Sequence, residues 1–365
     1  MIPYLVLAVT PLIFLPLVNA YYKTSINEDK KAQKTYLFLC GAMLFLIIAL
    51  RDKEVGSTDS LNYYNNWKTL SKLDFSKAQV IIKNHKMEPG YLYAVWVLSH
   101  VFVDPQWVFV FSGLFFTISV CRFIYINSDN VVMSIMMYIC LGLYTFMVQG
   151  LRQSVAMSIC LFAIEHAKKR NPIKFAILML IACFFHRSSI VFILTYFLFW
   201  KEFTIKVKLQ LLVAAALILI STPLFVRYGN EIVDREYGQT VDSGGFIFLA
   251  TYLIILLVAF LVIPVQNEQA EKRLLKHKVD EKSFFLAITM MGCCFYFMRY
   301  IGTLALERIS FYFMFGQLIT LPHVTKNFDR ISKMIINMAV IILSMVLFIY
   351  RLSGSDLVPY QFFWQ

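Results

Sequence analysis

Polar and charged residues interrupt this apolar chain at four places, and their types are suited to acid–base chemistry or to anion binding. The first place begins at Arg51 and includes Asp59 and Tyr64. A carboxylate can take a proton from a substrate hydroxyl. Asp59 also follows Gly56, so it is equally suited to cap a helix that we expect to begin near Leu61. Both roles stay open for Asp59.

The same segment continues to Glu88, which stands directly before Pro89 and the apolar run 91–103. A carboxylate that leads straight into apolar sequence has no evident structural reason, so Glu88 is a second candidate base. The run itself is shorter than the roughly 17 residues that a membrane span needs. We therefore expect residues 91–103 to form a re-entrant or interfacial segment.

The second place is the sequence Gly-Leu-Arg-Gln at 150–153, where an apolar run starts. A charge inside a membrane segment costs roughly 2.5 to 3.5 kcal/mol, so it usually faces the interior of the protein and has a function. Gln153 adds two hydrogen-bond donors and an acceptor beside Arg152. Both residues are candidates for binding a polar ligand.

The third place holds His186, Arg187 and Ser188 after two phenylalanines. A single histidine near an apolar face is often a hydrogen-bonded structural residue, whereas its charged and hydroxylic neighbours favour a base or a ligand site. We keep both readings of His186 and name Ser188 as a binding candidate. No second His or Cys stands at ligand spacing, so no metal site is expected.

The fourth place contains Arg299, Glu307 and Arg308. Glu307 and Arg308 are able to pair with other charges, because buried ions need partners. Two arginines at one turn are also suited to hold the oxygens of a diphosphate. We expect this turn to lie on the same membrane face as Arg152.

The composition indicates which elements position these residues. The chain has 365 residues, of which 59% are hydrophobic and 15% are charged, whereas soluble proteins have roughly 25% charged residues. The net charge of +12 comes from short basic clusters between apolar runs, as in the loops that orient membrane proteins. We therefore predict an all-α polytopic membrane protein embedded in a lipid bilayer, with no nucleic-acid partner.

Twelve apolar stretches are candidates for membrane spans, in addition to the run 91–103. They lie near 2–22, 35–50, 106–126, 131–148, 151–167, 173–186, 189–200, 208–226, 246–265, 283–301, 308–323 and 333–350. With this count the basic clusters 23–34, 168–174, 201–208, 272–282 and 326–333 share one face, which the positive-inside rule makes cytoplasmic. We expect residues 1–365 to form a single integral membrane domain with an outer loop at 51–105.

Apart from the loop 51–105, which carries seven basic residues, the expected outer face has arginine and no lysine. Arginine binds phosphate or carboxylate oxygens with two parallel hydrogen bonds and stays charged when it is partly desolvated. The pattern favours an acidic or phosphate-bearing ligand on that face, although single arginines also occur at span ends without a ligand. The residues are Arg152, Arg187, Arg227, Arg235, Arg299, Arg308 and Arg351.

Taken in order, these groups resemble the EpsG family of Wzy-like polysaccharide polymerases. The residues that carry the resemblance are Arg51, Gly56 to Asp59, Tyr63 or Tyr64, Glu88 to Tyr91, Gly150 to Gln153 with Ala156, Lys168 to Arg170, and Phe184 to Ser188. They cover about two fifths of the chain, and the second half is similar only in hydropathy and in Arg299 and Arg308.

The resemblance implies a glycosyltransferase of the bacterial cytoplasmic (inner) membrane, with its active site on the outer face and a fold like that of the GT-C class. Such an enzyme joins oligosaccharide repeat units carried on undecaprenyl diphosphate, into a capsule, an exopolysaccharide or an O-antigen. A chain-length regulator and a flippase are possible protein partners. No cofactor is expected.

On this reading Arg152, Arg299 and Arg308 stabilise the diphosphate leaving group. Asp59 or Glu88 is the first choice for the base, and His186 is the second. The remaining candidates for binding diphosphate or sugar are Arg51, Tyr64, Gln153, Ser188 and Glu307.

Two other classes of function stay open. One is a membrane O-acyltransferase or a polymer ligase, with the candidate histidine as base. The other is a flippase or transporter of lipid-linked sugars, against which stands the lack of paired interruptions and mid-membrane charges in the spans.

Overall fold

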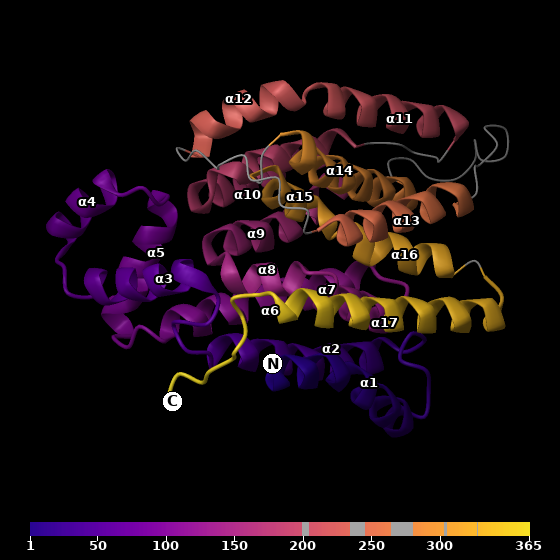
Figure 1. Ribbon diagram of the computed structural model, residues 1–365, viewed down its shortest axis with the longest axis horizontal. Helices are drawn as coiled ribbons and strands as arrows, with labels where there is room; N and C mark the ends of the chain where they lie inside the picture. Colours follow the sequence, from indigo (N-terminus) through magenta and orange to yellow (C-terminus); the bar gives the residue numbers. More distant parts are fainter. Residues whose placement is uncertain (199–203, 234–244, 264–279, 303–304, 327) are drawn as a thin grey trace. The chain divides into compact units, whose positions relative to one another are not determined.

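The computed structural model describes residues 1–198, 204–233, 245–263, 280–302, 305–326 and 328–365. Every regular element in these ranges is a helix (Figure 1), and their one β pairing is an isolated bridge between Arg51 and Phe362. The predicted all-helical class is therefore confirmed.

Within the described ranges, five helices are long and apolar enough to cross a membrane. They are α1 (Ile2–Tyr22), α2 (Lys30–Ala49), α6 (Trp107–Asn127), α14 (Glu281–Ile301) and α17 (Arg330–Ser353). A sixth candidate is the pair α7 (Val131–Cys140) and α8 (Leu143–Gln149), which is bent by 51°. These helices support the multi-pass membrane protein that the sequence predicts, whereas the number of about twelve spans and the GT-C-like fold remain predictions.

The other expected spans correspond to shorter helices. They are α9 (Leu151–Lys168), α10 (Pro172–Phe185), the 3₁₀ helix η1 (Arg187–Phe197), α11 (Ile205–Ile220), α12 (Thr222–Val233), α13 (Phe246–Val262), α15 (Ala305–Met314) and α16 (Gln317–Thr325). The expected spans 208–226 and 308–323 are each divided between two helices, as the span 131–148 is between α7 and α8. The far ends of the spans 189–200 and 246–265, parts of the basic clusters 201–208 and 272–282, and Arg235 lie outside the described residues.

The chain forms two compact units. The first comprises Met1–Phe162, Leu180–Arg187 and Met338–Gln365, and the second comprises Ala163–Met179 and Ser188–Asn337. A single integral domain over the whole chain stays a prediction.

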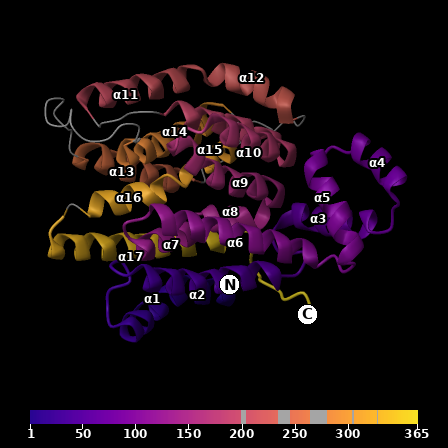
Figure 2. The same cartoon turned by 180° about the vertical axis from the view of Figure 1, so that it is seen from behind.

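In the first unit, small residues let α2 and α6 approach closely. A methyl group at Gly41 would lie 3.0 Å from the Thr117 side chain, and one at Gly113 would lie 2.9 Å from the Ile48 side chain. Small residues at helix interfaces replace the hydrophobic driving force that lipid does not supply. Figure 2 shows α6 and α7 beside α1 and α2.

Polar contacts fix the two ends of this helix group. At one end the Gln106 amide donates to the carbonyl oxygens of Ala49 (2.8 Å) and Arg51 (2.9 Å). At the other end the Asn27 amide donates to Asn130 Oδ1 at 3.2 Å, and Asn130 caps α7. The first unit therefore has an Arg51 end, and an opposite end that carries the basic cluster 23–34.

Both chain termini lie at the Arg51 end. Asp52 donates its backbone N–H to the Gln361 carbonyl at 2.9 Å. The rings of Tyr4 and Tyr360 meet edge to face with centroids 5.5 Å apart. The C-terminal tail after α17 thus holds the start of the segment 51–105 against the first helix.

The segment 51–105 contains three helices, α3 (Ser57–Leu70), α4 (Phe75–Asn84) and α5 (Pro89–Val101). Two indole N–H groups hold them together, since Trp67 donates to the Phe102 carbonyl at 2.9 Å and Trp96 donates to the Leu73 carbonyl at 3.0 Å. The helix α5 occupies the expected re-entrant segment and has 13 residues. It is shorter than the roughly 17 residues that a span needs.

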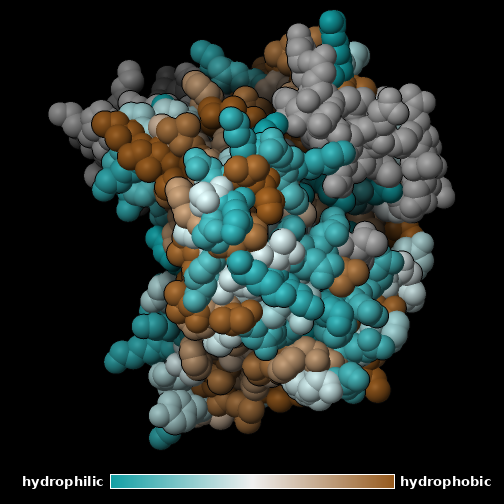
Figure 3. All heavy atoms as spheres, turned by 90° about the vertical axis from the view of Figure 1, so that its left-hand side faces the viewer, coloured by the Kyte–Doolittle hydropathy of each residue, from teal (hydrophilic) through white to brown (hydrophobic). Residues whose placement is uncertain are grey.

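The face of the molecule that shows α3, α4 and α5 is hydrophilic over much of its area (Figure 3). Five exposed lysines of the segment 51–105 contribute to it: Lys68, Lys72, Lys77, Lys83 and Lys86. Charged side chains stay in water when they can. The Arg51 end is therefore suited to lie at or beyond a membrane surface.

In the second unit, α14 packs against α11, α13, α15 and α16. A side chain at Gly316 would lie 2.8 Å from Thr289, whose hydroxyl is 2.9 Å from that of Thr320. This close packing makes α14 the most buried of the five span candidates.

Candidate functional site

A largely buried ion pair joins the second and the first of the predicted groups. Arg152 lies in the first turn of α9, and its Nη1 contacts Glu88 Oε2. Their side chains are only 15% and 12% exposed. Gln153, beside Arg152, is also buried. Two charges removed from water require close contact and further hydrogen bonds, so the surrounding residues are important.

The sequence Glu-Pro-Gly at 88–90 directs the carboxylate into this contact. Glu88 is the N-cap residue of α5, but its side chain makes no capping hydrogen bond. Instead, Glu88 Oε1 accepts a hydrogen bond from the Arg187 backbone N–H at 3.3 Å. Pro89 suits the first helical position because no N–H is needed there. Gly90 lies against the ring and carbonyl of Phe184 and has no room for a side chain.

The positive charges around Glu88 keep it ionised. Burial raises its pKa, but the charges of His186 and Arg152 and hydrogen bonds from backbone amides outweigh burial, so the pKa of Glu88 lies below its usual value. Glu88 is therefore a carboxylate at neutral pH. A group with a lowered pKa is a weak proton acceptor, so the geometry favours Glu88 as the residue that holds Arg152.

Two buried tyrosines complete the surroundings of Arg152. Tyr63 and Tyr91 both interact electrostatically with Arg152, and their ring centroids are 5.5 Å apart. Within the described residues, Arg152 Nε and the Tyr91 hydroxyl are buried without a hydrogen-bond partner. Both groups keep a donor for a ligand oxygen.

The prediction named Tyr64 as a binding candidate, whereas Tyr63 was named only among the residues that carry the resemblance. The structure places Tyr63 beside Arg152, whereas Tyr64 is half-buried with Lys53 Nζ at 5.6 Å from its ring. The helical spacing of the sequence could have identified Tyr63, because the buried positions of α3 are 60, 63, 67 and 70. This is the period of one helix face.

Asp59 lies in the first turn of α3. The expected helix start near Leu61 is wrong, because α3 begins at Ser57 with Gly56 as its N-cap residue at φ +97°. A left-handed residue at this point suits glycine. Asp59 is therefore not the cap, although a carboxylate in the first turn still interacts favourably with the helix dipole. Its role as a base remains a prediction.

Arg51 is fully buried in this structure. Its guanidinium stacks over the ring of Phe109 at 4.2 Å and donates from Nη1 to the Val55 carbonyl at 2.7 Å. A side chain at Gly56 would lie 2.7 Å from the same nitrogen. These contacts fix the turn that leads into α3.

The candidates Ser188, Arg299, Glu307 and Arg308 belong to the second unit. Arg299 Nη1 lies 2.6 Å from Glu307 Oε2, and the two side chains are 8% and 18% exposed. The Ser188 hydroxyl lies 3.2 Å from that of Tyr312. Arg308 is exposed. The second unit therefore has its own largely buried arginine–carboxylate pair.

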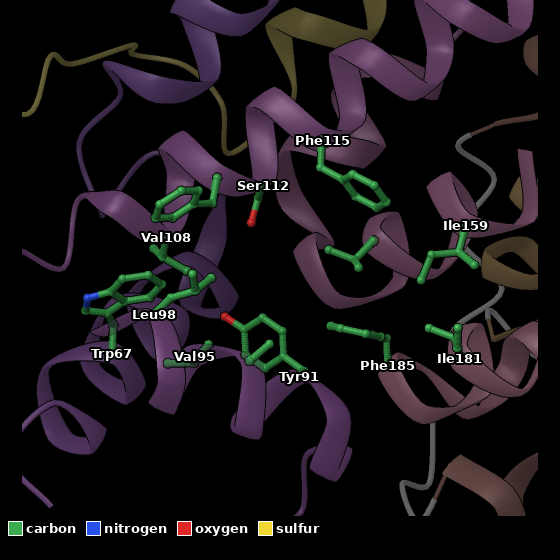
Figure 4. A pocket seen from close by; sticks show the side chains of 13 residues that line it. Trp67, Tyr91, Val95, Leu98, Val108, Ser112, Phe115, Ile159, Ile181 and Phe185 are labelled. Atoms are coloured by element: carbon green, nitrogen blue, oxygen red, sulfur yellow. The ribbon is translucent and has the colours of Figure 1, made fainter. Parts of the chain in front are cut away.

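An apolar cavity of about 390 Å³ lies in the first unit. Figure 4 shows Trp67 and Leu98 on one side of it, Ile159 and Phe185 on the other, and Tyr91 between them. It falls within the range of about 300 to 1,000 Å³ that is usual for small-molecule sites.

Among the residues that the structure describes, no group of three or more His, Cys, Asp or Glu side chains is close enough to hold a metal ion. The sequence model of the EpsG family matches residues 34–362 of the chain. This match confirms the resemblance predicted from the motifs and extends it over the second half. No curated protein and no solved structure matches the chain.

Proposed function

The chain belongs to the EpsG family, and from this premise we propose that it is a membrane glycosyltransferase. It polymerises oligosaccharide repeat units linked to undecaprenyl diphosphate into a surface polysaccharide. The observation that carries the proposal is the largely buried Glu88–Arg152 pair, because a cation that is held in place while its Nε keeps a free donor is what an anionic leaving group requires.

The reaction transfers the growing chain from its lipid diphosphate to a sugar hydroxyl of a second lipid-linked unit. The bond between the anomeric carbon and the diphosphate oxygen breaks, and the diphosphate leaves with the electron pair. A bond forms between the acceptor oxygen and the anomeric carbon, and the acceptor proton passes to a base. The charge that develops on the diphosphate is the feature that the protein must stabilise.

Arg152 is suited to this task. Its Nη1 is bound to Glu88, whereas its Nε has no partner among the described residues. An arginine remains charged in a partly desolvated site and binds phosphate oxygens directionally. Arg299 and Arg308 stay candidates for binding diphosphate oxygens in this proposal, and Arg51, Tyr64, Gln153, Ser188 and Glu307 stay further binding candidates.

The proton acceptor is Asp59 or His186 in this proposal. Glu88 is occupied by Arg152 and by the Arg187 amide, and we assign it the positioning of Arg152. Asp59 is half-buried on α3 and interacts with Tyr63, and His186 is half-buried at the end of α10. Tyr63 interacts in turn with Arg152, and His186 precedes Arg187, whose backbone N–H binds Glu88.

The proposal places the reaction at the outer face of a bacterial cytoplasmic membrane, in a GT-C-like protein of about twelve spans. The glycan would be a capsule, an exopolysaccharide or an O-antigen. The chemistry that we assign to the protein's own groups needs no metal. A flippase would supply the substrate and a chain-length regulator would limit the product.

Reconstitution of the purified protein with lipid-diphosphate-linked repeat units tests this function. We expect a ladder of products that differ by one repeat unit, with release of the lipid diphosphate. A single shift in product size would instead indicate a ligase. Movement of the labelled lipid across the bilayer without any change in sugar length would indicate a transporter, and either result would overturn the proposal.

A further inference from the structure

The apolar cavity of the first unit lies next to the Glu88–Arg152 ion pair. On α9 the cavity is lined by Val155 and Ile159, which follow Arg152 at helical spacing along one face. On α5 it is lined by Tyr91, which follows Glu88 by three residues, and by further residues on the same face. Residues three and four apart are neighbours on a helix surface. The charged pair therefore lies at one end of the cavity.

The walls of the cavity are almost entirely hydrocarbon. Five aromatic side chains contribute to them, namely Trp67, Tyr91, Phe111, Phe115 and Phe185. The Trp67 N–H is already bound to the Phe102 carbonyl. The hydroxyls of Tyr91 and Ser112 are the polar side-chain groups in the lining.

Water is a poor occupant of this space. The cavity would hold roughly a dozen molecules at about 30 Å³ each, and every buried water needs two to four polar partners. The cavity walls supply too few polar groups to bind that many water molecules. The cavity instead suits an apolar occupant that has a polar group at one end, where Tyr91 and Arg152 keep free donors.

We infer that this cavity binds the first isoprene units of the polyprenyl chain that carries the sugar, with the phosphate end of that chain at Arg152 and the Tyr91 hydroxyl. This inference rests on the proposed function, which requires a lipid diphosphate at Arg152. The cavity holds only the beginning of a long chain. The remainder of the polyprenyl chain lies outside the cavity, along the side chains of Leu180, Ile181 and Phe184. These side chains are 71%, 42% and 49% exposed.

The cavity would discriminate between kinds of hydrocarbon chain, and would not bind every apolar chain equally well. A hydrocarbon tail gains little by moving from lipid into an apolar pocket, because both surroundings are equally apolar. The binding free energy must therefore come from close packing of the chain against a preformed cavity. A branched, unsaturated chain has fewer freely rotating bonds than a saturated acyl chain, so it loses less entropy on the aromatic walls.

A sugar-free probe tests the inference separately from catalysis. Proteoliposomes are illuminated with a polyprenyl phosphate that bears a diazirine on its first isoprene unit, and labelled peptides are identified by mass spectrometry. We expect labels on α5, α6 and α9. An excess of unlabelled polyprenyl phosphate should remove them, whereas a saturated alkyl phosphate of equal length should not.

Filling the cavity should prevent this labelling. Ile159→Trp fills it from α9, and Ala94→Leu is a milder substitution from the α5 wall. We expect labelling to fall by about tenfold in both variants. The matched control is Leu114→Trp on α6, at a side chain that is 44% exposed, which should keep wild-type labelling.

The outcomes separate the two proposals. Unchanged labelling in both filled variants, or equal displacement by the saturated alkyl phosphate, overturns the inference even if the wild-type protein makes a ladder. Labelling that the filled variants lose, in a protein that makes no ladder, supports the cavity and overturns the polymerase.

Discussion

At the scale of single residues, Arg152 carries the charge on which the proposed chemistry depends, and Glu88 determines where that charge points. The two are 64 positions apart in the chain. The sequence predicted each as a candidate site residue, because each places a charge at the edge of apolar sequence. It did not indicate that they pair, since a contact between distant positions is not visible in one sequence.

The contribution of Glu88 to stability should depend on pH. The folded state lowers the pKa of Glu88, so the stabilisation is fully present above the ordinary value of 4.5 and is lost as the pH falls through the lowered value. We expect Glu88→Gln to lower the free energy of unfolding by about 3 kcal/mol at neutral pH, because a buried arginine loses its partner.

Thermal unfolding of the two proteins in detergent, from pH 7 downward, measures this difference. The gap between wild type and Glu88→Gln should shrink in acid below about pH 4.5. A gap that stays constant over this range would show that ionised Glu88 does not stabilise the fold.

At the scale of helices, apolar runs predicted where most elements lie, since a membrane requires them. The run 131–148 is nevertheless divided by Gly142, a left-handed residue at φ +91° that contacts the Arg351 guanidinium. The run 308–323 is divided close to Gly316, which packs on Thr289. The mean hydropathy of a sequence window does not reveal such a helix break, because one glycine hardly lowers that mean.

Gly90 gives a test at this scale. A methyl group there would overlap the backbone of Phe184, so Gly90→Ala should move α5 away from α10 and displace Glu88. Overpacking of this kind costs about 1 to 3 kcal/mol. We expect a lower unfolding temperature and a loss of product ladder.

Gly354→Ala is the matched control, because nothing lies within 4 Å of the added methyl group. Its stability and ladder should equal those of wild type. Wild-type behaviour of Gly90→Ala would show that the approach of Phe184 does not position the site.

At the scale of the whole molecule, the sequence predicted the class of protein but not its division into units. The C-terminal tail illustrates the limit, because it packs on Asp52 and Tyr4 from more than 300 positions away. The candidate residues were predicted as one site, and the structure distributes them over two units.

The proposed topology places the two ends of the first unit on opposite sides of the membrane. Ser76 is exposed on α4 and Ser25 is exposed in the turn between α1 and α2, at opposite ends of the first unit. We expect a membrane-impermeant thiol reagent to label Ser76→Cys in intact cells, and to label Ser25→Cys only after the cells are permeabilised. The unsubstituted protein is the control for its native cysteines, and labelling of both positions from outside would contradict the proposed topology.

The most direct test of the central claim is the product ladder of Arg152→Ala in the reconstituted assay, measured beside Arg122→Ala. Arg122 stacks on Phe162 at 5.0 Å and has no part in the proposed site. We predict that Arg152→Ala lowers the rate of polymerisation by roughly 100-fold, the loss typical of removing one group that stabilises developing charge, while Arg122→Ala forms a normal ladder. A normal ladder from Arg152→Ala would contradict the account.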